Sequence, residues 1–332
     1  MSTEEAISLF RETYAAVRSE IGRVMVGQDA IVEGTLNAIF AGGHVLLEGV
    51  PGLGKTLLVR TLGEVLDLSF SRIQFTPDLM PADIVGTNLV METPEGRKEF
   101  QFQKGPIFAH LVLADEINRA TPKTQSAMLE AMQERQVTAG GELRLLPQPF
   151  FVLATQNPID QEGTYPLPEA QLDRFFFKLV VGYPTAAELT EVLNRTTEGG
   201  KVFPQKMLDG PGLSGLQGLV RQVPIASHVK DYAVRLVLAT HPKTGTSSPI
   251  SNQYLRFGSS PRGAQVLVLA GKVRALTQGR FNVSYDDIAA VSTAALRHRL
   301  IVNFEAEAEG ITTDQVIAQI LKDVPRDSGA SV

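Results

Sequence analysis

Short apolar runs alternate with amphipathic segments along the first half of the chain. Residues 44–48, 70–75 and 150–155 have the length and composition of strands, and the nearly unbroken apolar run 108–114 is typical of a central parallel strand. Residues 57–66 carry apolar side chains at the spacing of an amphipathic helix. This order of strands and helices predicts an α/β domain built on a parallel sheet.

Two further segments have the pattern of β-hairpins inserted between these strands. In each, two short stretches rich in β-forming residues flank a turn-forming group. The paired stretches are residues 89–91 with 100–102 around the turn 93–96, and residues 136–138 with 143–146 around Gly140-Gly141.

Helical patterns dominate the second half of the chain. Tyr183-Pro184 is expected to end the sheet domain, and Thr185 with Glu188 forms a capping box that opens a helix. Residues 199–224 are rich in Gly, Pro and Lys and predict a loop with one short helix. The other expected elements are a polar loop at 244–253 and helices at 229–240, 263–278, 312–324 and after a cap at Ser284.

The segment between the first strand and the first helix matches the phosphate-binding (Walker A) pattern G-x-x-x-x-G-K-[ST]. Its glycines let backbone N–H groups turn toward a polyphosphate, and the helix N-terminus adds positive dipole. Lys55 can reach the β- and γ-phosphates, and the Thr56 hydroxyl can ligate Mg²⁺. A plain glycine-rich turn is the alternative. The predicted nucleotide-binding residues here are Gly49, Val50, Pro51, Gly52, Leu53, Gly54, Lys55, Thr56 and Leu57.

Two adjacent carboxylates follow the apolar run 108–114, in a Walker B arrangement. Asp115 would hold Mg²⁺ through its water shell, and Glu116 is placed to polarise an attacking water. The alternative is a solvated helix start, because Asp and Glu favour the first turn of a helix. We predict Thr56 and Asp115 as metal ligands and Glu116 as a catalytic residue.

The strand at 150–155 delivers Gln156 and Asn157 to the edge where open α/β sheets bind ligands. The Asn157 amide is predicted to orient water beside the γ-phosphate and to report hydrolysis, whereas a simple turn at Asn157-Pro158 is the alternative. The segment 157–160 is not an N-K-x-D guanine-binding motif, so ATP is the expected nucleotide.

The composition excludes several classes of protein. The chain has 332 residues, of which 43% are hydrophobic and 20% charged, as in folded globular proteins. The lack of cysteine excludes disulfides, cysteine-ligated metal centres and a thiol nucleophile, and the five histidines lack the spacing of a metal site. The acidic start and the absence of a long apolar run predict no signal peptide, no membrane insertion and a cytoplasmic location.

The net charge of −5 is unevenly divided. Residues 1–182 carry 15 Lys and Arg against 23 Asp and Glu, a balance of −8, whereas the remainder carries 16 against 13, a balance of +3. The acidic part holds the phosphate-binding pattern. We therefore expect a protein client and no nucleic-acid partner.

These motifs together resemble those of the AAA+ ATPases, and specifically the MoxR family. The resemblance covers nearly the whole chain and includes Val26, Gly27 and Gln28, which resemble the segment that lies against the adenine. Its other motifs lie at residues 115–120, 129–134, 154–158, 169–175, 260–262 and 296–299. The resemblance implies an AAA+ parallel-sheet domain of the helix-2-insert type, followed by an all-α lid domain. The implied divisions are an N-terminal helix at 1–20, the α/β nucleotide-binding domain at 21–182, the lid at 183–310 and a C-terminal helix and tail at 311–332.

The resemblance also implies a homo-oligomeric, hexameric ring that uses ATP and Mg²⁺ at sites between subunits. Arg174 then acts as an arginine finger in a neighbour's site, and Arg262 as the sensor 2 arginine, in its own or a neighbouring subunit. Without the resemblance, Arg174 could equally form an intramolecular ion pair, and Arg262 could be an ordinary surface arginine.

The implied function is chaperone-like remodelling or maturation of protein partners that carry von Willebrand factor A domains. The alternatives are the motor subunit of a metal chelatase and a nucleic-acid motor of the helicase-like branches. The two hairpins resemble family inserts that project toward the ring pore. We expect them to contact either the substrate or the neighbouring subunits.

Overall fold

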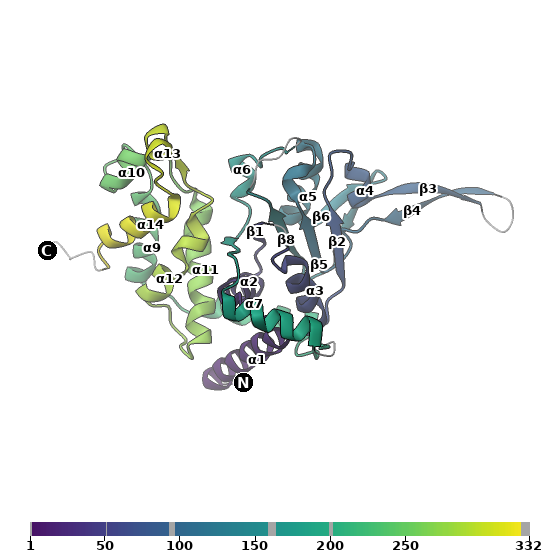
Figure 1. The fold of residues 1–332 in the computed structure, drawn as a ribbon, viewed down its shortest axis with the longest axis horizontal. Coiled ribbons are helices and arrows are strands. Elements are labelled where there is room, and N and C mark those ends of the chain that lie inside the picture. The colour runs from purple at the N-terminus through teal and green to yellow at the C-terminus, as the bar shows by residue number, and fades with distance from the viewer. Residues whose placement is uncertain (1, 51, 93–96, 159–163, 199–201, 327–332) are drawn as a thin grey trace.

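The computed structural model describes residues 2–50, 52–92, 97–158, 164–198 and 202–326. A five-stranded parallel sheet forms the centre of its N-terminal part (Figure 1). The four predicted strands are confirmed, although the apolar run 108–114 becomes a strand only from Leu111, and the sheet has a fifth strand at its edge. In spatial order the strands are β2 (Phe70–Gln74), β5 (Leu111–Asp115), β8 (Phe151–Gln156), β1 (Val45–Glu48) and β9 (Phe177–Val180).

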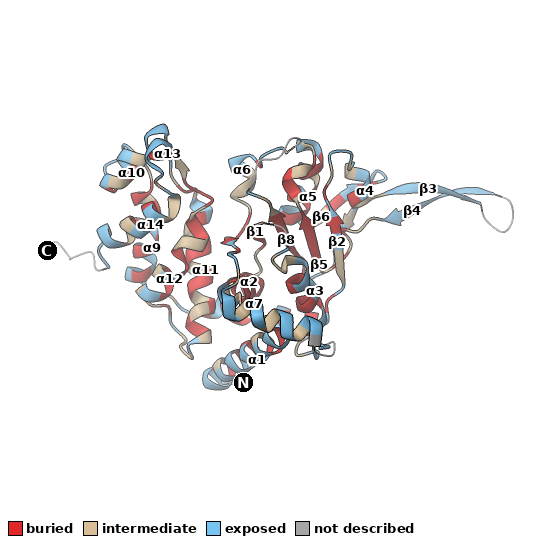
Figure 2. Ribbon diagram, viewed as in Figure 1, coloured by how far each residue is buried: buried red, intermediate tan, exposed pale blue. Residues whose placement is uncertain are grey.

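The central strands are buried on both faces, which accounts for their nearly unbroken apolar sequences (Figure 2). Leu111 and Leu113 of β5 face one hydrophobic core, whereas Val112 and Ala114 face a second. This packing holds the carboxyl ends of the strands in a fixed relation. The first core is formed with α1 (Thr3–Val24), α2 (Asp29–Ala41) and α3 (Lys55–Val65), and the second with α4 (Pro81–Val85) and α5 (Pro122–Glu134).

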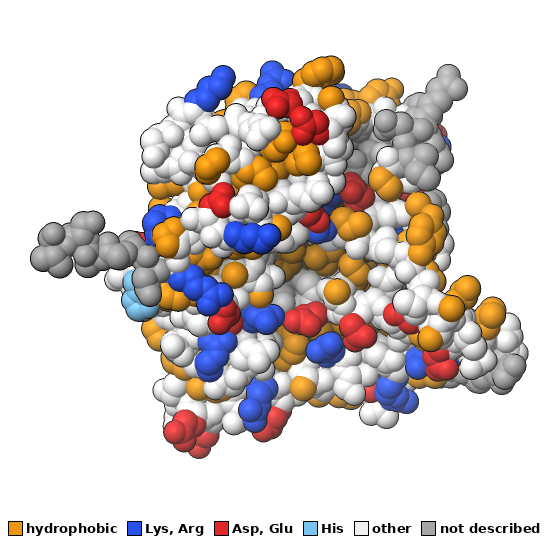
Figure 3. Space-filling view, turned by 60° about the vertical axis from the view of Figure 1, so that its left-hand side comes forward, with side chains coloured by type: hydrophobic (Ala, Val, Ile, Leu, Met, Phe, Trp, Pro, Cys, Tyr) orange, Lys and Arg blue, Asp and Glu red, His pale blue; other side chains and the backbone are white. Residues whose placement is uncertain are grey.

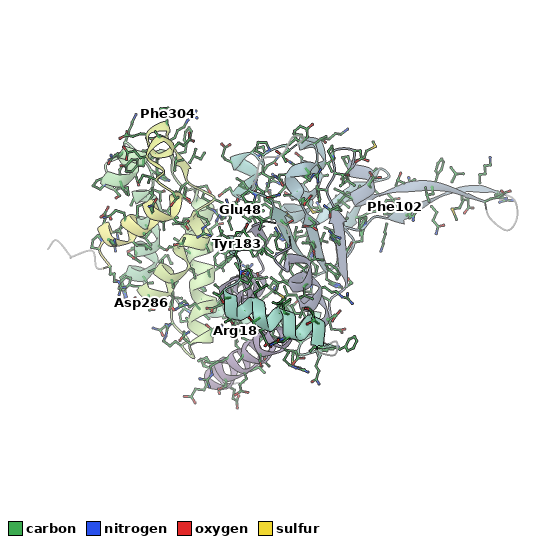
Figure 4. All side chains as sticks on the ribbon, in the orientation of Figure 1. Arg18, Glu48, Phe102, Tyr183, Asp286 and Phe304 are labelled. Carbon is green, nitrogen blue, oxygen red and sulfur yellow. The ribbon has the colours of Figure 1, made fainter. Side chains whose placement is uncertain are left out.

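Both predicted hairpins are confirmed, although the turn 93–96 lies outside the described residues. The longer hairpin extends away from the body of the molecule (Figure 1). Phe102, near its base in Figure 4, packs under the Arg144 guanidinium, whose carbon lies 3.7 Å from the ring centroid. The two hairpins therefore contact each other. Their strands are β3 (Gly86–Glu92) with β4 (Lys98–Lys104), and β6 (Gln136–Ala139) with β7 (Glu142–Leu145).

The C-terminal part is a helical lid packed beside the sheet domain (Figure 1). The predicted capping boxes at Thr185 and Ser284 are confirmed, and the helix expected at 263–278 begins at Pro261. The lid also contains a short antiparallel strand pair, β10 (Leu255–Phe257) with β11 (Ile301–Val302). Helix α7 (Ala186–Leu193), which continues into a π-helical turn (Asn194–Glu198), precedes the lid helices. The lid helices are α8 (Gly210–Gln222), α9 (Ser227–Ala239), α10 (Pro249–Tyr254), α11 (Pro261–Thr277), α12 (Tyr285–Leu296), α13 (Phe304–Glu309) and α14 (Thr313–Asp323).

Two predictions for the lid need correction. The short helix expected within 199–224 is the 13-residue α8, and α10 occupies part of the polar loop expected at 244–253. Four glycines lower the intrinsic helix propensity of α8, but Leu213 and Val220 bury its apolar face in the first core. Tertiary packing therefore outweighs propensity here. No helix in the described ranges is both long and apolar enough to cross a bilayer.

Candidate nucleotide-binding site

The sheet order brings the predicted motifs to one edge. The phosphate-binding segment follows β1, Asp115 ends β5 and Asn157 follows β8, the strand between them. The Gly49 N–H donates to the Gln156 carbonyl oxygen at 3.2 Å, which ties the loop to β8. A cavity of about 350 Å³ opens there, lined by Gly52, Gly54, Lys55, Thr56, Leu57, Arg72, Gln74, Asp115, Glu116 and Asn157.

The loop leaves a helix N-terminus open toward this cavity. Gly54 caps α3 with φ of 77°, and Gly52 has φ of 85°, conformations that glycine adopts without steric strain. In the described part of the chain no side chain caps α3, so its first backbone N–H groups are available to a phosphate. Of the other loop residues, Val50 and Leu53 are half-buried, and Pro51 lies outside the described residues.

The Lys55 side chain bridges the loop. Its Nζ donates to the Gly49 carbonyl oxygen, and Gly49 packs closely against Val181 after β9. Burial lowers the pKa of Lys55, an effect that the nearby carboxylates of Asp115 and Glu116 oppose. A positive charge in this half-buried position is suited to bind the phosphates of a nucleotide.

Thr155 holds the two acidic residues in a fixed geometry. Its Oγ1 donates to Asp115 Oδ1 at 2.6 Å and accepts the Glu116 backbone N–H at 2.7 Å. Glu116 adopts a left-handed conformation with φ of 56°, which costs a non-glycine residue about 1 kcal/mol. Strain of this kind is frequent at functional sites. Oε2 of Glu116 accepts hydrogen bonds from Gln74 Nε2 and Arg119, each at 3.3 Å.

Arg72, Gln74 and Thr155 were not among the predicted site residues. The signal for the first two was present, because Arg72 and Gln74 are polar residues at alternate positions of an otherwise strand-like run. Arg72 donates to Asp115 Oδ2 from Nη2 at 2.6 Å and from Nε at 3.1 Å. The Arg72 guanidinium therefore lies directly against the Asp115 carboxylate. The oxygens of Asp115 and Thr56 are ligands of the type that Mg²⁺ prefers. The residues present fit this metal.

Both predicted arginines donate hydrogen bonds to residues of α5. Arg174, which follows α6 (Glu169–Leu172), donates from Nη1 to the Leu129 carbonyl oxygen of α5 at 2.6 Å. Arg262 donates to Asp173 Oδ2 at 3.1 Å and to Gln133 Oε1 at 3.4 Å. Neither arginine is among the described residues that line the cavity.

The predicted adenine segment lies between the loop and α7. Gly27 and Gln28 both have positive φ, 65° and 59°, at the start of α2. Gln28 Nε2 donates to the Gly182 carbonyl oxygen at 2.9 Å, and the Glu188 carboxylate packs so closely against Gly27 that a Cβ atom there would overlap it. Met25, the residue before this segment, lies against the phosphate-binding loop, because a Cβ atom at Gly54 would lie 3.6 Å from its Cε.

Known proteins share both the sequence and the fold. The chain is 45% identical over 307 residues to Chaperone MoxR1 of Mycobacterium tuberculosis, covering 92% of this chain and 80% of that protein. It is 30% identical to Protein MoxR of Methylorubrum extorquens, covering 95% and 96% of the two chains. The chain belongs to the MoxR family of AAA+ ATPases. Its residues 44–177 match the family described as "ATPase family associated with various cellular activities (AAA)", and residues 248–320 match the AAA lid domain.

The predicted fold of this MoxR-family chain is confirmed. A crystal structure of a protein from Cytophaga hutchinsonii superposes on it with a TM-score of 0.91 at 43% identity, covering 98% of both chains. Basic and acidic side chains are interspersed on the face drawn in Figure 3.

Proposed function

We propose that this MoxR-family protein hydrolyses ATP with Mg²⁺ and uses the energy for chaperone-like remodelling of protein partners. One observation carries the proposal. The open helix N-terminus at Gly54, the Lys55 side chain, and the carboxylates of Asp115 and Glu116 all meet at one cavity. A phosphate cradle beside a carboxylate pair is the arrangement that phosphoryl transfer to water requires.

Each side chain has a distinct proposed role. The backbone N–H groups at the start of α3 and the Lys55 ammonium bind the phosphates, while Thr56 and Asp115 hold the metal. Mg²⁺, when bound, neutralises charge on the phosphate oxygens. Glu116 accepts a proton from, or polarises, the attacking water, and the Asn157 amide orients that water. Burial and the bonds from Thr155 keep the acids in place before substrate arrives.

We further propose that Arg174 and Arg262 act in the site of a neighbouring subunit. Neither side chain is among the described residues that line the cavity of its own subunit, which supports a role for their charge in stabilising a transferring phosphoryl group across an interface. This supports a homo-oligomeric ring, for which we propose six subunits. Light scattering of the Glu116→Gln variant with and without ATP tests it, and a monomer under both conditions would refute the ring.

We propose a protein with a von Willebrand factor A domain as the client, contacted through the hairpin inserts. Four large apolar side chains on the longer hairpin are exposed: Leu89, Val90, Met91 and Phe100. Exposed apolar side chains on a projecting element are suited to protein contact, whereas a basic surface would be needed for nucleic acid. Retention of a von Willebrand factor A domain protein on immobilised Glu116→Gln protein with ATP tests this client.

The decisive experiment is a steady-state ATPase assay of Glu116→Gln. We expect ATP binding to persist and turnover to fall at least 100-fold, roughly 3 kcal/mol of barrier, because the water loses its proton acceptor. The matched control is Glu64→Gln, at an exposed glutamate of α3 that pairs with Arg60. A near wild-type rate in Glu116→Gln would remove Glu116 from this role, and absence of ATPase activity in the wild type would refute the function.

A further inference from the structure

The motif at residues 296–299 has no role in the site described above, yet it contains the most deeply buried arginine that forms an ion pair in the described residues. The Arg299 side chain is 1% exposed and lies between the lid and the sheet domain. Each of its N–H groups has an acceptor. Nε donates to Asp173 Oδ1 at 3.0 Å, Nη2 donates to the carbonyl oxygens of Asp173 (2.9 Å) and Phe175 (2.7 Å), and Nη1 donates to those of Phe176 and Ala295.

Asp173 connects this buried arginine with the lid helix that carries Arg262. Its Oδ1 accepts from Arg299 and also from Ser260 Oγ at 2.7 Å, and its Oδ2 accepts from Arg262 at 3.1 Å. Ser260 is the cap of α11, the helix in which Arg262 follows at the first turn. Both carboxylate oxygens of Asp173 thus accept hydrogen bonds, Oδ1 from the buried Arg299 and from Ser260, and Oδ2 from the exposed Arg262.

The same contacts fix Arg174. Arg299 donates hydrogen bonds to the backbone on both sides of Arg174, at the carbonyl oxygens of Asp173 and Phe175. The Arg299 guanidinium is held in this position, because a buried charge that loses its partner is strongly unfavourable. The segment that carries Arg174 therefore cannot shift relative to the lid without breaking these bonds.

We propose that the Asp173–Arg299 ion pair is a positioning unit that presents Arg174 from the sheet domain and Arg262 from the lid as one surface to a neighbouring subunit. The inference rests on the proposed function, in which both arginines act in the neighbour's site. Asp173 and Arg299 are positioning residues, since they act through the two arginines. The pair joins the lid to the sheet domain, so a rotation of the lid relative to the sheet would break it and separate the two arginines.

The test compares Arg299→Lys with a matched control in the same motif, Arg297→Lys. Arg297 pairs with Asp314, with 3.0 Å between its Nε and Asp314 Oδ1, so the control makes the same chemical change at an ion pair that does not involve Asp173. We expect Arg299→Lys to lower kcat at least about tenfold, because misplacement of catalytic groups by about 1 Å has effects of this size. The Kd for a fluorescent ATP analogue should stay within about threefold, and Arg297→Lys should keep kcat within about twofold.

A mixing experiment separates positioning from a general structural effect. Lys55→Ala subunits cannot bind phosphate but retain both arginines, so adding them to Arg299→Lys subunits should give more ATPase activity than either variant alone. Absence of this rescue overturns the inference. Activity that is lost in Arg174→Ala but retained in Arg299→Lys also overturns it, whereas an inactive wild type refutes the proposed function instead.

A second variant covers the case in which Arg299→Lys does not fold, as judged by its thermal melting. Ser260→Ala removes one hydrogen bond to Asp173 and the side-chain cap of α11, and it leaves the bonds of Arg299 in place. We expect a lower kcat with an unchanged Kd for the ATP analogue. The inference is overturned if Arg299→Lys does not fold and a folded Ser260→Ala protein keeps the wild-type kcat. In that case Asp173, Ser260 and Arg299 contribute to stability alone.

Discussion

His44, just before β1, makes the stability of this protein depend on pH. The residue is buried, with Nε2 3.0 Å from the Met132 carbonyl oxygen and Nδ1 3.0 Å from the Val152 backbone nitrogen. Because the Val152 N–H must donate, Nδ1 carries no proton and Nε2–H donates to Met132. The neutral ring therefore links β8 to α5 across the start of the strand that carries the phosphate-binding loop. A second proton would have to break the bond to Val152.

The expected size of the effect follows from linkage. Burial lowers the pKa of His44 from 6.5 to about 4, and the positive charge of Arg135 adds to this, against the opposing bond to Met132. Between these two values the unfolded chain binds more protons than the folded one, so stability is complete above pH 6.5 and is lost as pH falls toward 4. At about 1.4 kcal/mol per pKa unit, the loss between pH 7 and pH 5 is about 2 kcal/mol. Burial lowers the pKa of His298 as well, which adds a loss of the same sign.

Urea unfolding of the wild type and of His44→Gln at pH 7 and pH 5 measures the contribution. A glutamine can keep both hydrogen bonds without titrating, so the wild type should lose about 2 kcal/mol more than the variant over this range. His228→Gln, at an exposed position of α9, is the control and should follow the wild type. Equal losses in the wild type and in His44→Gln would refute the reasoning.

Three further predictions concern other sites. Asp287→Asn should reduce the free energy of unfolding by about 3–5 kcal/mol, since Asp287 is buried and accepts from Arg280 at 2.7 and 2.8 Å; a loss below about 1 kcal/mol in urea would contradict this. Phe10→Ala should cost a similar amount, about 3–5 kcal/mol in the same assay, because its buried ring packs 5.3 Å from that of Phe40. Arg72→Ala removes the cation from Asp115, so ATP binding should require less Mg²⁺, by at least about threefold in a metal titration; an increased requirement would show that Arg72 supports the metal site instead.

The strands and the phosphate-binding loop could be predicted because each is contiguous in the chain. Lys55 and Thr56 lie within one loop, and the open start of α3 follows from the local backbone at Gly54. The position of Asp115 at a strand end could be predicted, because the strand is buried on both faces and its apolar sequence stops at this first charged residue. The glycine-rich α8 was harder to predict, since packing against the core rather than propensity stabilises it.

Other parts of the site depend on which strands are neighbours. Arg72 reaches Asp115 only because β2 pairs with β5, with Arg72 opposite Leu113, and Thr155 reaches both acids only because β8 lies on the other side. No local pattern specifies that order of strands. The roles of Arg72, Gln74 and Thr155 therefore emerge only from the tertiary structure.

The sequence by itself determined the phosphate-binding loop and the two carboxylates that follow a buried strand, because the backbone of such a loop and the end of a buried strand are local properties. The tertiary structure decided which side chains surround that centre and where the two arginines lie. Arg299 and Asp173 are separated by 126 positions, yet they form the ion pair that joins the lid to the segment of Arg174. Such a contact arises only when the two domains pack together, because burial of the Arg299 charge is strongly unfavourable without a paired carboxylate.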